Sequence, residues 1–463
     1  MNLELFRYNY NEDCIRPDTL KMNTDNGKRK TENGLFRILT FGCKVNQCDS
    51  TALAQALITR GWREAPEGVA PDLILVNTCT VTGRADQQAR QAIRGLARDY
   101  PGTPLWVTGC YAQRSPAELA ALPGVQGVLG NREKARLADL LADLFTEPPL
   151  LRVGPLSPGE ALEALPAPII LGRTLPRLKI QDGCEHHCTY CIVPQVRGPR
   201  RSLPPADVAA ALEQLAAAGY REAVLTGVNL GQYGVDLTPP TDLASLLGAI
   251  RSRPRPPRLR LSSLEPQEVT QALLKELASF PGFCPHFHLP LQSGAAPVLA
   301  AMGRDYTPEE FRDLVEEINR NIPDAGLGLD VLVGFPGETA ADFEATYTLV
   351  EALKVTYLHV FPFSPRPGTP AARLRRVPAP QVKARAKRMR ELGQRKKRQF
   401  LEAQLGRTGE VLVEGSAPRT GRLKGLSANY LRVLLSGPPE WHNQILTVRF
   451  QEVREEALVG EVV

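Results

Sequence analysis

The sequence has no long hydrophobic run and no recognisable export signal. A membrane-spanning helix needs about 18 or more consecutive apolar residues, whereas a typical longest run here is DLILV. The polar start of the chain also lacks the apolar centre and the small-residue cleavage site of a signal peptide. We therefore expect a cytoplasmic protein without a membrane partner, in which residues 1–34 form a disordered extension.

Neither sign of charge is in large excess, and the cysteines are few. The chain has 463 residues, of which 56 are Lys or Arg and 50 are Asp or Glu, so its formal charge is +6. Such a mildly basic balance permits a nucleic-acid partner without requiring one. The nine cysteines are an odd number, and disulfides are rare in a reducing cytosol, so metal binding explains clustered cysteines better.

Strand-like and helical runs divide the chain into an α/β protein with three folded regions. Their alternation in residues 35–146 predicts a parallel sheet with crossover helices. Residues 147–176 hold seven prolines and are expected to be a linker. Six β–α units follow in residues 177–404, too few for a closed eightfold barrel, so we expect a partial (β/α)6 barrel with a basic C-terminal helix. Short strand-like runs in residues 405–463 predict a small antiparallel β-barrel.

The stretch DGCEHHCTYC carries three cysteines with C-x3-C-x2-C spacing, and no fourth cysteine follows nearby. A structural zinc site needs four ligands, which His186 or His187 would have to complete. Both histidines lie inside the loop between the first two cysteines, where reaching the same metal is awkward. An iron–sulfur cluster held by three thiolates, with one iron left open, is the interpretation that we favour.

With Tyr190 just before the last cysteine, at the end of the first strand of a β–α series, this stretch resembles the radical S-adenosylmethionine superfamily. The resemblance implies that Cys184, Cys188 and Cys191 hold a [4Fe-4S] cluster whose free iron binds S-adenosylmethionine. An electron from the cluster then cleaves this cofactor to methionine and a radical. Tyr190 would pack near the adenine, and the two histidines would be bystanders.

Four later strand ends strengthen this resemblance: LTGVNLG, SSLEP, PLQSG and GFPGET. Each alone is explained by an ordinary turn, but together they follow the order and spacing of the superfamily's cofactor contacts. LTGVNLG departs from the pattern because the usual acidic residue is missing. The cofactor-binding residues implied are Gly227, Asn229, Ser263, Gln292 and Gly334.

Three further cysteines, Cys43, Cys79 and Cys110, follow three strands of the N-terminal region at equivalent places. In a parallel sheet such ends converge on one edge. The alternative is that they are buried as small hydrophobic side chains. Because one placement recurs three times, we favour a second three-cysteine cluster, again with an open iron.

Two such clusters, a radical core and a terminal barrel together resemble the methylthiotransferases from about residue 36 onward. GCKVNQ, NTCTVT and GCYAQ are most similar to the branch acting on N6-threonylcarbamoyladenosine at position 37 of tRNA. The resemblance implies two [4Fe-4S] clusters and a TRAM-like, RNA-binding terminal barrel. It also implies transfer of a methylthio group to C2 of that adenine in the anticodon loop.

Partners implied by the resemblance are tRNA, an electron donor such as a flavodoxin or ferredoxin, and a sulfur donor. Two alternatives remain open within the same chemistry, namely isopentenyladenosine in tRNA and a ribosomal protein as substrate. A third, from another class, is a non-catalytic, zinc-stabilised RNA-binding protein.

Basic residues stand out in two places. Arg197, Arg200 and Arg201 follow the cysteine loop and either form a solvated turn or contact a cofactor carboxylate or tRNA phosphate. Residues 373–398 contain twelve Lys or Arg against one acid. For this run we favour a phosphate-binding surface over a merely solvated helix face.

Other cysteines and histidines lack a motif. Cys48, Cys14 and Cys284 are expected to be spectators, and His286 and His288 are expected to be structural.

Overall fold

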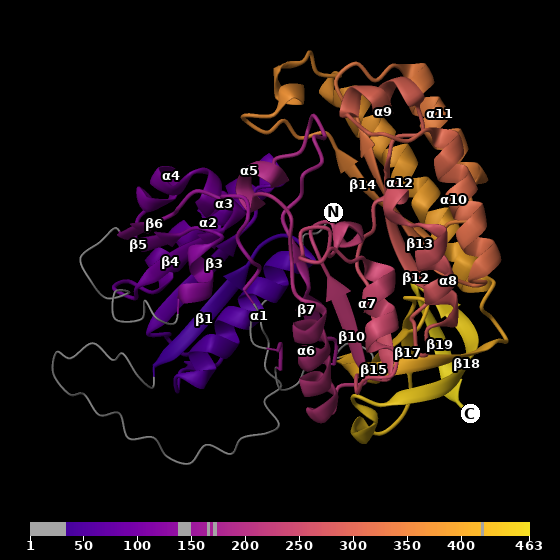
Figure 1. Ribbon diagram of the computed structural model, residues 1–463, viewed down its shortest axis with the longest axis horizontal. Coiled ribbons are helices and arrows are strands. Elements are labelled where there is room, and N and C mark those ends of the chain that lie inside the picture. Colours follow the sequence, from indigo (N-terminus) through magenta and orange to yellow (C-terminus); the bar gives the residue numbers. More distant parts are fainter. Residues whose placement is uncertain (1–33, 138–149, 164–166, 170–173, 418–420) are drawn as a thin grey trace. The chain divides into compact units, whose positions relative to one another are not determined.

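The computed structural model describes residues 34–137, 150–163, 167–169, 174–417 and 421–463, and the chain divides into two compact units (Figure 1). The first unit extends to Pro158 and also includes Ile192–Pro199. The second includes Arg173–Cys191, directly before that segment, and everything from Arg200 onward. Of the extension predicted to be disordered, residues 1–34, all but the last residue lie outside the described residues, and Cys14 is among them.

The first unit is built on a parallel six-stranded sheet with the order β2-β1-β3-β4-β5-β6. Its strands are β1 (Leu35–Thr40), β2 (Arg63–Glu64), β3 (Leu73–Thr78), β4 (Leu105–Gly109), β5 (Val125–Leu129) and β6 (Leu150–Arg152). Every residue of β3 and β4 is buried, which explains their continuous apolar sequence. The parallel α/β sheet predicted for this region is confirmed.

Helices connect these strands. They are α1 (Lys44–Thr59), α2 (Gly83–Asp99), α3 (Cys110–Arg114), α4 (Pro116–Ala120) and the 3-10 turn η2 (Glu133–Arg136). Separate hydrophobic clusters form around Ile93 of α2 and around Leu57 of α1. The helix α5 (Val193–Arg197) also belongs to this unit, although it follows the second cysteine motif in the sequence.

The segment expected to be a linker, residues 147–176, is not wholly a linker. Leu150–Arg152 form β6, which pairs with β5 at the edge of the sheet. The sequence did not predict this strand, because a run of three residues between prolines is too short to show a hydrophobic period.

The second unit contains the six predicted parallel strands of the radical core. They are β7 (Arg177–Lys179), β10 (Glu222–Thr226), β11 (Arg258–Leu261), β12 (His286–Gln292), β13 (Gly326–Val333) and β14 (Tyr357–Pro362). They form two three-stranded sheets, with β10 between β7 and β11 and β13 between β12 and β14. Parallel bridges from Leu259 to Phe283 and from Ser263 to His288 join the β11 and β12 regions. The predicted partial (β/α)6 arrangement is confirmed.

A short hairpin closes the base of the cysteine loop, and helices cover the strands. The hairpin is β8 (Gln181–Asp182) paired with β9 (Arg201–Ser202). The helices are α6 (Pro205–Ala217), α7 (Leu243–Ile250), α8 (Gln271–Ser279), α9 (Ala296–Met302), α10 (Pro308–Asn321), α11 (Ala340–Ala352) and α12 (Ala379–Glu402), with the 3-10 turns η4 (Leu230–Gln232), η5 (Pro266–Glu268) and η6 (Pro370–Arg373). Figure 1 shows α6 and α7 beside β7 and β10, and α10 to α12 beside β12 to β14. None of the described helices is both long and apolar enough to cross a membrane.

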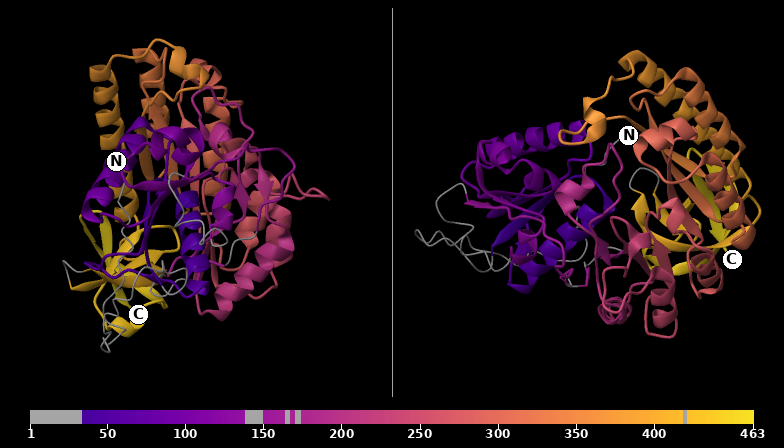
Figure 2. Two further views of the ribbon diagram at one scale, coloured as in Figure 1. Left: turned by 90° about the vertical axis from the view of Figure 1, so that its left-hand side faces the viewer. Right: turned by 45° about the horizontal axis from the view of Figure 1, so that its top comes forward.

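The C-terminal strands form a closed five-stranded barrel with the order β15-β16-β17-β19-β18, drawn in yellow in Figure 2. Its elements are β15 (Thr408–Ala417), β16 (Arg422–Ser427), β17 (Arg432–Leu435), η7 (Pro439–Trp441), β18 (Ile445–Arg454) and β19 (Ala457–Val462). The predicted barrel is confirmed, with one difference. The pair β17 and β19 runs parallel, whereas the other pairs are antiparallel.

Candidate metal centres

The first cysteine set lies at the carboxyl ends of three neighbouring strands. Cys43 caps the N-terminus of α1 after β1, Cys79 follows β3, and Cys110 is the first residue of α3 after β4. Burial, and after it charge repulsion from Cys110 and Cys43, raises the pKa of Cys79. The structure therefore brings these three thiols together, as expected from the sequence pattern.

Two glycines allow this convergence. Gly42 has φ +101°, and a Cβ added there would lie 2.5 Å from Cβ of Cys79. Gly109 has φ +96°, and a Cβ there would lie 2.3 Å from the carbonyl oxygen of Thr78. Any larger side chain would strain the backbone and separate the strand ends. This is the physical reason for the Gly-Cys pairs at the ends of β1 and β4.

N–H groups point at two of the sulfur atoms. The amide N–H of Val81 donates to Sγ of Cys79 at 3.5 Å. Nε–H of Arg197 donates to Sγ of Cys110 at 3.3 Å, and Nδ2 of Asn131 lies 3.7 Å from the same sulfur. Donors of this kind stabilise thiolates and tune the potential of a cluster that they hold.

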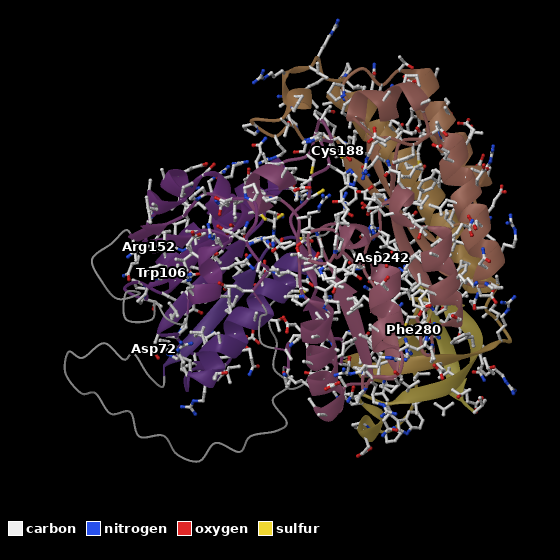
Figure 3. The ribbon with its side chains drawn as sticks, viewed as in Figure 1. Asp72, Trp106, Arg152, Cys188, Asp242 and Phe280 are labelled. Atoms are coloured by element: carbon white, nitrogen blue, oxygen red, sulfur yellow. The ribbon has the colours of Figure 1, made fainter. Side chains whose placement is uncertain are left out.

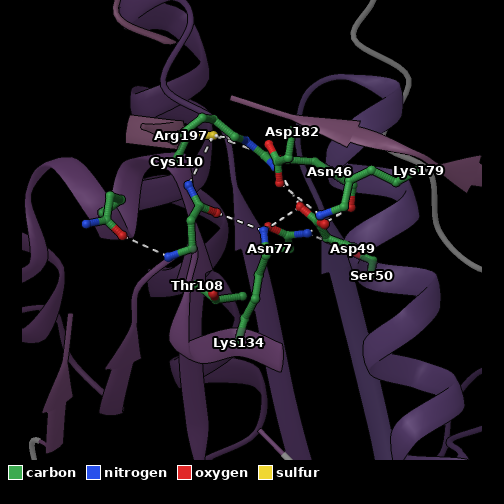
Figure 4. Close-up of polar contacts among 12 residues, drawn as sticks. Asn46, Asp49, Ser50, Asn77, Thr108, Cys110, Lys134, Lys179, Asp182 and Arg197 are labelled. Atoms are coloured by element: carbon green, nitrogen blue, oxygen red, sulfur yellow. Dashed lines mark hydrogen bonds and ion pairs between the residues drawn. The ribbon is translucent and has the colours of Figure 1, made fainter. Parts of the chain in front are cut away.

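A buried ion pair supports the arginine of this arrangement (Figure 4). Arg197 is 2% exposed, and its Nη2 lies 3.0 Å from Oδ2 of Asp49. Lys134 also pairs with Asp49, and its Nζ donates to Oδ1 of Asn131 at 2.8 Å. Buried charges persist only when they are paired and hydrogen-bonded. Asp49 is therefore the counter-ion that fixes Arg197 beside Cys110.

Amide side chains complete the network on the other side. Asn46, which accepts from Arg197, donates to the carbonyl oxygens of Phe41 at 2.8 Å and Thr78 at 2.9 Å. Asn77 in turn donates to the carbonyl oxygen of Asn46 at 2.8 Å. These bonds tie the ends of β1 and β3 to α1.

Arg197 does not lie in a solvated turn, because it is 2% exposed and paired with Asp49. Contact of this arginine with a cofactor carboxylate or a tRNA phosphate stays a prediction. Arg197 contacts Asp49 and Cys110, which lie far away in the sequence, so no local pattern predicts its position. Arg200 pairs with Glu185 at 3.1 Å, and Arg201 lies 3.9 Å from Asp182.

The spacing of the thiols fits a cluster better than a single zinc ion. Ligands around one zinc at Zn–S distances near 2.3 Å lie about 3.8 Å apart. Among the described residues, only His288, Asp330 and His359 bring three potential ligand atoms within 4.8 Å of one another, so neither cysteine set does. A four-iron cluster separates its thiolates more widely, and its positive irons stabilise the thiolate form of its ligands. The residues present therefore fit such a group.

The second cysteine set lies in the loop after β8, where Figure 3 labels Cys188. The amide of Cys191 donates to the carbonyl oxygen of Cys188 at 3.0 Å. Partial burial, opposed by a backbone hydrogen bond and reinforced by the charge of Cys188, raises the pKa of Cys184 to about 11. Tyr190 packs edge-on against Phe335, with ring centroids 6.4 Å apart.

Two of the predicted contact residues lie beside this loop. Asn229 is 3% exposed, and its amide N–H donates to Oε1 of Gln181 at 2.8 Å. Its Nδ2 lies 4.0 Å from Sγ of Cys184 and donates to Oε1 of Glu268 at 2.9 Å. Gly227 is adjacent, since a Cβ added there would lie 2.9 Å from Oε1 of Gln181.

Glu268, from η5, is an acidic residue beside this loop that the sequence pattern did not single out. Oε2 of Glu268 and Oδ1 of Asn229 are buried acceptors that have no hydrogen-bond partner in the part of the chain that the structure describes. His186 lies against the other oxygen of Glu268, at 3.1 Å. Unsatisfied acceptors beside Cys184 fit a cationic amino group, such as that of S-adenosylmethionine. The sequence signal was present in SSLEPQE, one turn beyond the motif that we had singled out.

The other predicted contacts have different surroundings. Ser263 is hydrogen-bonded to Nδ1 of His288 at 2.6 Å. Gly334 has φ +75°, and a Cβ there would lie 2.5 Å from Cγ2 of Val382. Gln292 ends β12 with φ +60°. Close helix packing accounts for Gly334 without any ligand.

Of the residues expected to be spectators, Cys48 is buried within α1, and Cys284 is buried beside Nε of Arg258 at 3.4 Å. His286 is hydrogen-bonded to the hydroxyl of Tyr357 at 2.8 Å. These contacts agree with structural roles.

Two family models match the chain. Residues 36–130 match the family described as Uncharacterized protein family UPF0004, and residues 178–350 match the Radical SAM superfamily. The fold is also similar to the radical S-adenosylmethionine methyltransferase TsrM from Kitasatospora setae, with a TM-score of 0.56 at 18% identity. That match covers 74% of this chain and 74% of the other.

Relatives with curated names extend the similarity over most of the length. The threonylcarbamoyladenosine tRNA methylthiotransferase MtaB of Bacillus subtilis is 36% identical over 417 residues, which are 89% of this chain and 92% of the relative. The proteins of the same name from Aquifex aeolicus and Thermotoga maritima are each 36% identical. They match 81% and 92% of this chain and 91% and 96% of their own lengths. The chain therefore belongs to the methylthiotransferase family of radical S-adenosylmethionine enzymes.

Proposed function

We propose that the protein transfers a methylthio group to C2 of N6-threonylcarbamoyladenosine at position 37 of tRNA. The observation that carries this proposal is the 36% identity to three relatives named for that activity, along 91% to 96% of their lengths. Membership in a family of enzymes removes the alternative of a non-catalytic, zinc-stabilised RNA-binding protein.

The cofactors of the proposed reaction are two [4Fe-4S] clusters and S-adenosylmethionine. Bound at the second cysteine set, S-adenosylmethionine supplies the radical chemistry that an unactivated C–H bond requires, because such a bond offers no acidic proton to a general base. Cys43, Cys79 and Cys110 would hold the first cluster, with Arg197 donating to Cys110. Cys184, Cys188 and Cys191 would hold the second.

Around the second cysteine set, side chains of the protein would bind and orient S-adenosylmethionine. Glu268 and Asn229 present acceptors for the amino group of S-adenosylmethionine, and Gln181 fixes the backbone of Asn229. Asn229 and Gln181 are buried, and the side chain of Glu268 is only 12% exposed, so water competes little for these bonds.

Partners of the proposed reaction are the anticodon loop of tRNA, an electron donor such as a flavodoxin or ferredoxin, and a sulfur donor. The TRAM-like barrel and the basic residues of 373–398 are the parts of the chain proposed to bind tRNA.

Mass spectrometry of tRNA nucleosides from a deletion strain tests the proposed substrate. The expected result is loss of the methylthio group from threonylcarbamoyladenosine alone, restored by the wild-type gene. Loss from isopentenyladenosine instead, or a change confined to a ribosomal protein, would identify a different substrate, and an unchanged set of modifications would refute the proposal.

Replacing Glu268 by glutamine is expected to weaken S-adenosylmethionine binding. A hydrogen bond to a charged group contributes about 1.5–3 kcal/mol, so the dissociation constant should rise by about 10- to 150-fold. Anaerobic equilibrium dialysis with cluster-loaded protein measures this. The control is Glu276→Gln on α8, which removes an equal charge from the ion pair that Glu276 forms with Arg251. Equal affinities for wild type and Glu268→Gln would remove Glu268 from the cofactor site.

The basic run falls into two groups once its partners are known. Several of its cations are neutralised, among them Arg385 by Glu338, Arg388 by Glu344 and Arg395 by Glu351. Others form no ion pair with any described residue and are exposed. These are Arg373, Arg375, Arg376, Lys383 and Arg390. The unpaired group is the better candidate for tRNA phosphates.

The double variant Arg375→Gln/Arg376→Gln is expected to bind tRNA with a shallower salt dependence. Each lost phosphate contact lowers the slope of log affinity against log salt by about 0.7 to 0.9. Filter binding between low and moderate salt measures the slope. The matched control, Arg388→Gln/Arg395→Gln, removes two cations that already have carboxylate partners and should change the slope by less than half as much. Equal slopes for wild type and the first variant would exclude this surface.

A further inference from the structure

Two histidines and an aspartate meet on neighbouring strands of the second unit, outside both cysteine sets. His288 lies on β12, Asp330 on β13 and His359 on β14. Asp330 is directly opposite His359, and His288 is opposite Gly328, two residues before Asp330. Side chains two residues apart on a strand share a face. The ligand atoms of all three residues lie within 4.8 Å of one another.

The closest approach among them lacks the geometry of a hydrogen bond. Nε2 of His288 lies 3.0 Å from Oδ1 of Asp330, yet both atoms are buried without a hydrogen-bond partner in the described part of the chain. Nδ1 of His359 lies 3.3 Å from the same oxygen. The two ring nitrogens and the carboxylate oxygen thus lie close together, although His288 and Asp330 do not form a well-directed hydrogen bond.

The surroundings prepare these atoms for a cation. Nδ1 of His288 is hydrogen-bonded to Oγ of Ser263 at 2.6 Å, which fixes the ring and leaves Nε2 available. The ring of Tyr357 packs against both histidines, with centroids 6.1 Å from His288 and 5.2 Å from His359.

The donor set selects a class of metal. Two imidazoles and one carboxylate suit zinc, iron(II), cobalt(II) and related divalent ions, whereas calcium and magnesium prefer oxygen ligands alone. Bonds near 2.0–2.2 Å place neighbouring donors about 2.9–3.5 Å apart. The 3.0 and 3.3 Å separations here lie within that interval.

We propose that His288, Asp330 and His359 bind one divalent ion of the zinc class through Nε2, Oδ1 and Nδ1 respectively. Three protein ligands leave a coordination position open, as in zinc sites that accept an external ligand. The side chain of His359 is 51% exposed, so the site can be reached from solvent.

The open position suits an anionic oxygen, and here the inference rests on the proposed function. The threonyl group of threonylcarbamoyladenosine carries a carboxylate, whereas an isopentenyl group carries none. A metal on the face of β12 to β14 would bind the first substituent and gain nothing from the second. This gives the protein a chemical basis for choosing between two modified adenosines.

Zinc content and X-ray absorption test the metal site on the full-length, cluster-loaded protein. After exposure to stoichiometric zinc and removal of the excess, wild type should retain one zinc per chain. Its shell should contain nitrogen and oxygen at about 2.0–2.1 Å and no sulfur at about 2.3 Å. Sulfur in the shell would place the metal at a cysteine set and overturn the proposal.

Two variants and a control sharpen the measurement. Asp330→Asn keeps the size of the side chain, and His359→Gln changes a half-exposed one, so the fold should survive in both. Each should lose the zinc while its iron content stays equal to that of wild type. His442→Gln, an exposed histidine of the barrel, should keep it. Zinc retained equally in all variants, or absent from wild type, would reduce the three residues to a polar contact.

A second experiment tests the proposed carboxylate contact independently of the metal site. Addition of the nucleoside N6-threonylcarbamoyladenosine should change the X-ray absorption spectrum of the bound zinc, whereas addition of N6-isopentenyladenosine should not. An unchanged spectrum with both nucleosides would overturn the carboxylate contact and leave the metal site standing. Failure of the proposed function is detected separately, in the tRNA nucleosides of the deletion strain.

Discussion

Replacing Arg197 by methionine is expected to destabilise the first unit by about 3 kcal/mol, the lower end of what loss of one partner from a buried ion pair costs. The variant removes one cationic partner from Asp49, whose side chain is fully buried, while the pair with Lys134 stays. Urea unfolding followed by tryptophan fluorescence measures the loss. Trp62 and Trp106 are both 1% exposed in the first unit, so a Trp441→Phe background makes the signal specific to it.

The same variant removes the N–H donor to Sγ of Cys110. Hydrogen bonds to cluster sulfurs raise the reduction potential, so the midpoint potential of a cluster at the first cysteine set should become more negative. The matched control is Arg200→Met in the same loop. Its partly exposed pair with Glu185 contributes at most about 1 kcal/mol. Equal stabilities and potentials for the two variants would show that Arg197 has no special role.

Replacing Cys110 by alanine is expected to abolish methylthio transfer while S-adenosylmethionine cleavage continues. Under the proposed function, the iron content should fall from about eight to about four per chain, because a three-thiolate site that loses one ligand does not hold its cluster. Activity on tRNA should drop below detection. Formation of 5′-deoxyadenosine, measured by chromatography, should persist because Cys184, Cys188 and Cys191 are intact.

Cys48→Ala is the control for this prediction. Cys48 lies in α1, five residues from Cys43 in the sequence, and is 5% exposed. Its replacement removes a buried sulfur of the same unit without touching a proposed ligand, so iron content and product should stay near those of wild type. A Cys110→Ala protein that kept all of its iron would exclude a cluster at the first cysteine set.

Much of the fold was predictable because its signals are local. The alternation of strands and helices, and the cysteines after β1, β3 and β4, depend only on short stretches. The six strands of the core were recognised for the same reason, since their apolar runs end in glycine or polar residues. β6 was missed because three residues between prolines carry no period.

The parts of the site that were missed depend on contacts across the fold. Arg197 meets Asp49 nearly 150 positions away in the sequence, and no local pattern links them. Glu268 reaches Asn229 only because η5 follows β11 at the same edge as β10. His288 and His359 become neighbours of Asp330 through strand register, which a single sequence does not reveal.

The segment Ile192–Pro199 limits how parts of this chain can be exchanged with those of relatives. In the sequence it is flanked by residues of the second unit, but in the structure it belongs to the first. A hybrid joining this chain up to Pro158 to a relative's remaining sequence takes Asp49 and Lys134 from one parent and residue 197 from the other. The ion pairs among these residues survive in such a hybrid only if both parents carry the same charges at these three positions. Recombination should therefore exchange the two regions freely only among relatives that keep this set intact.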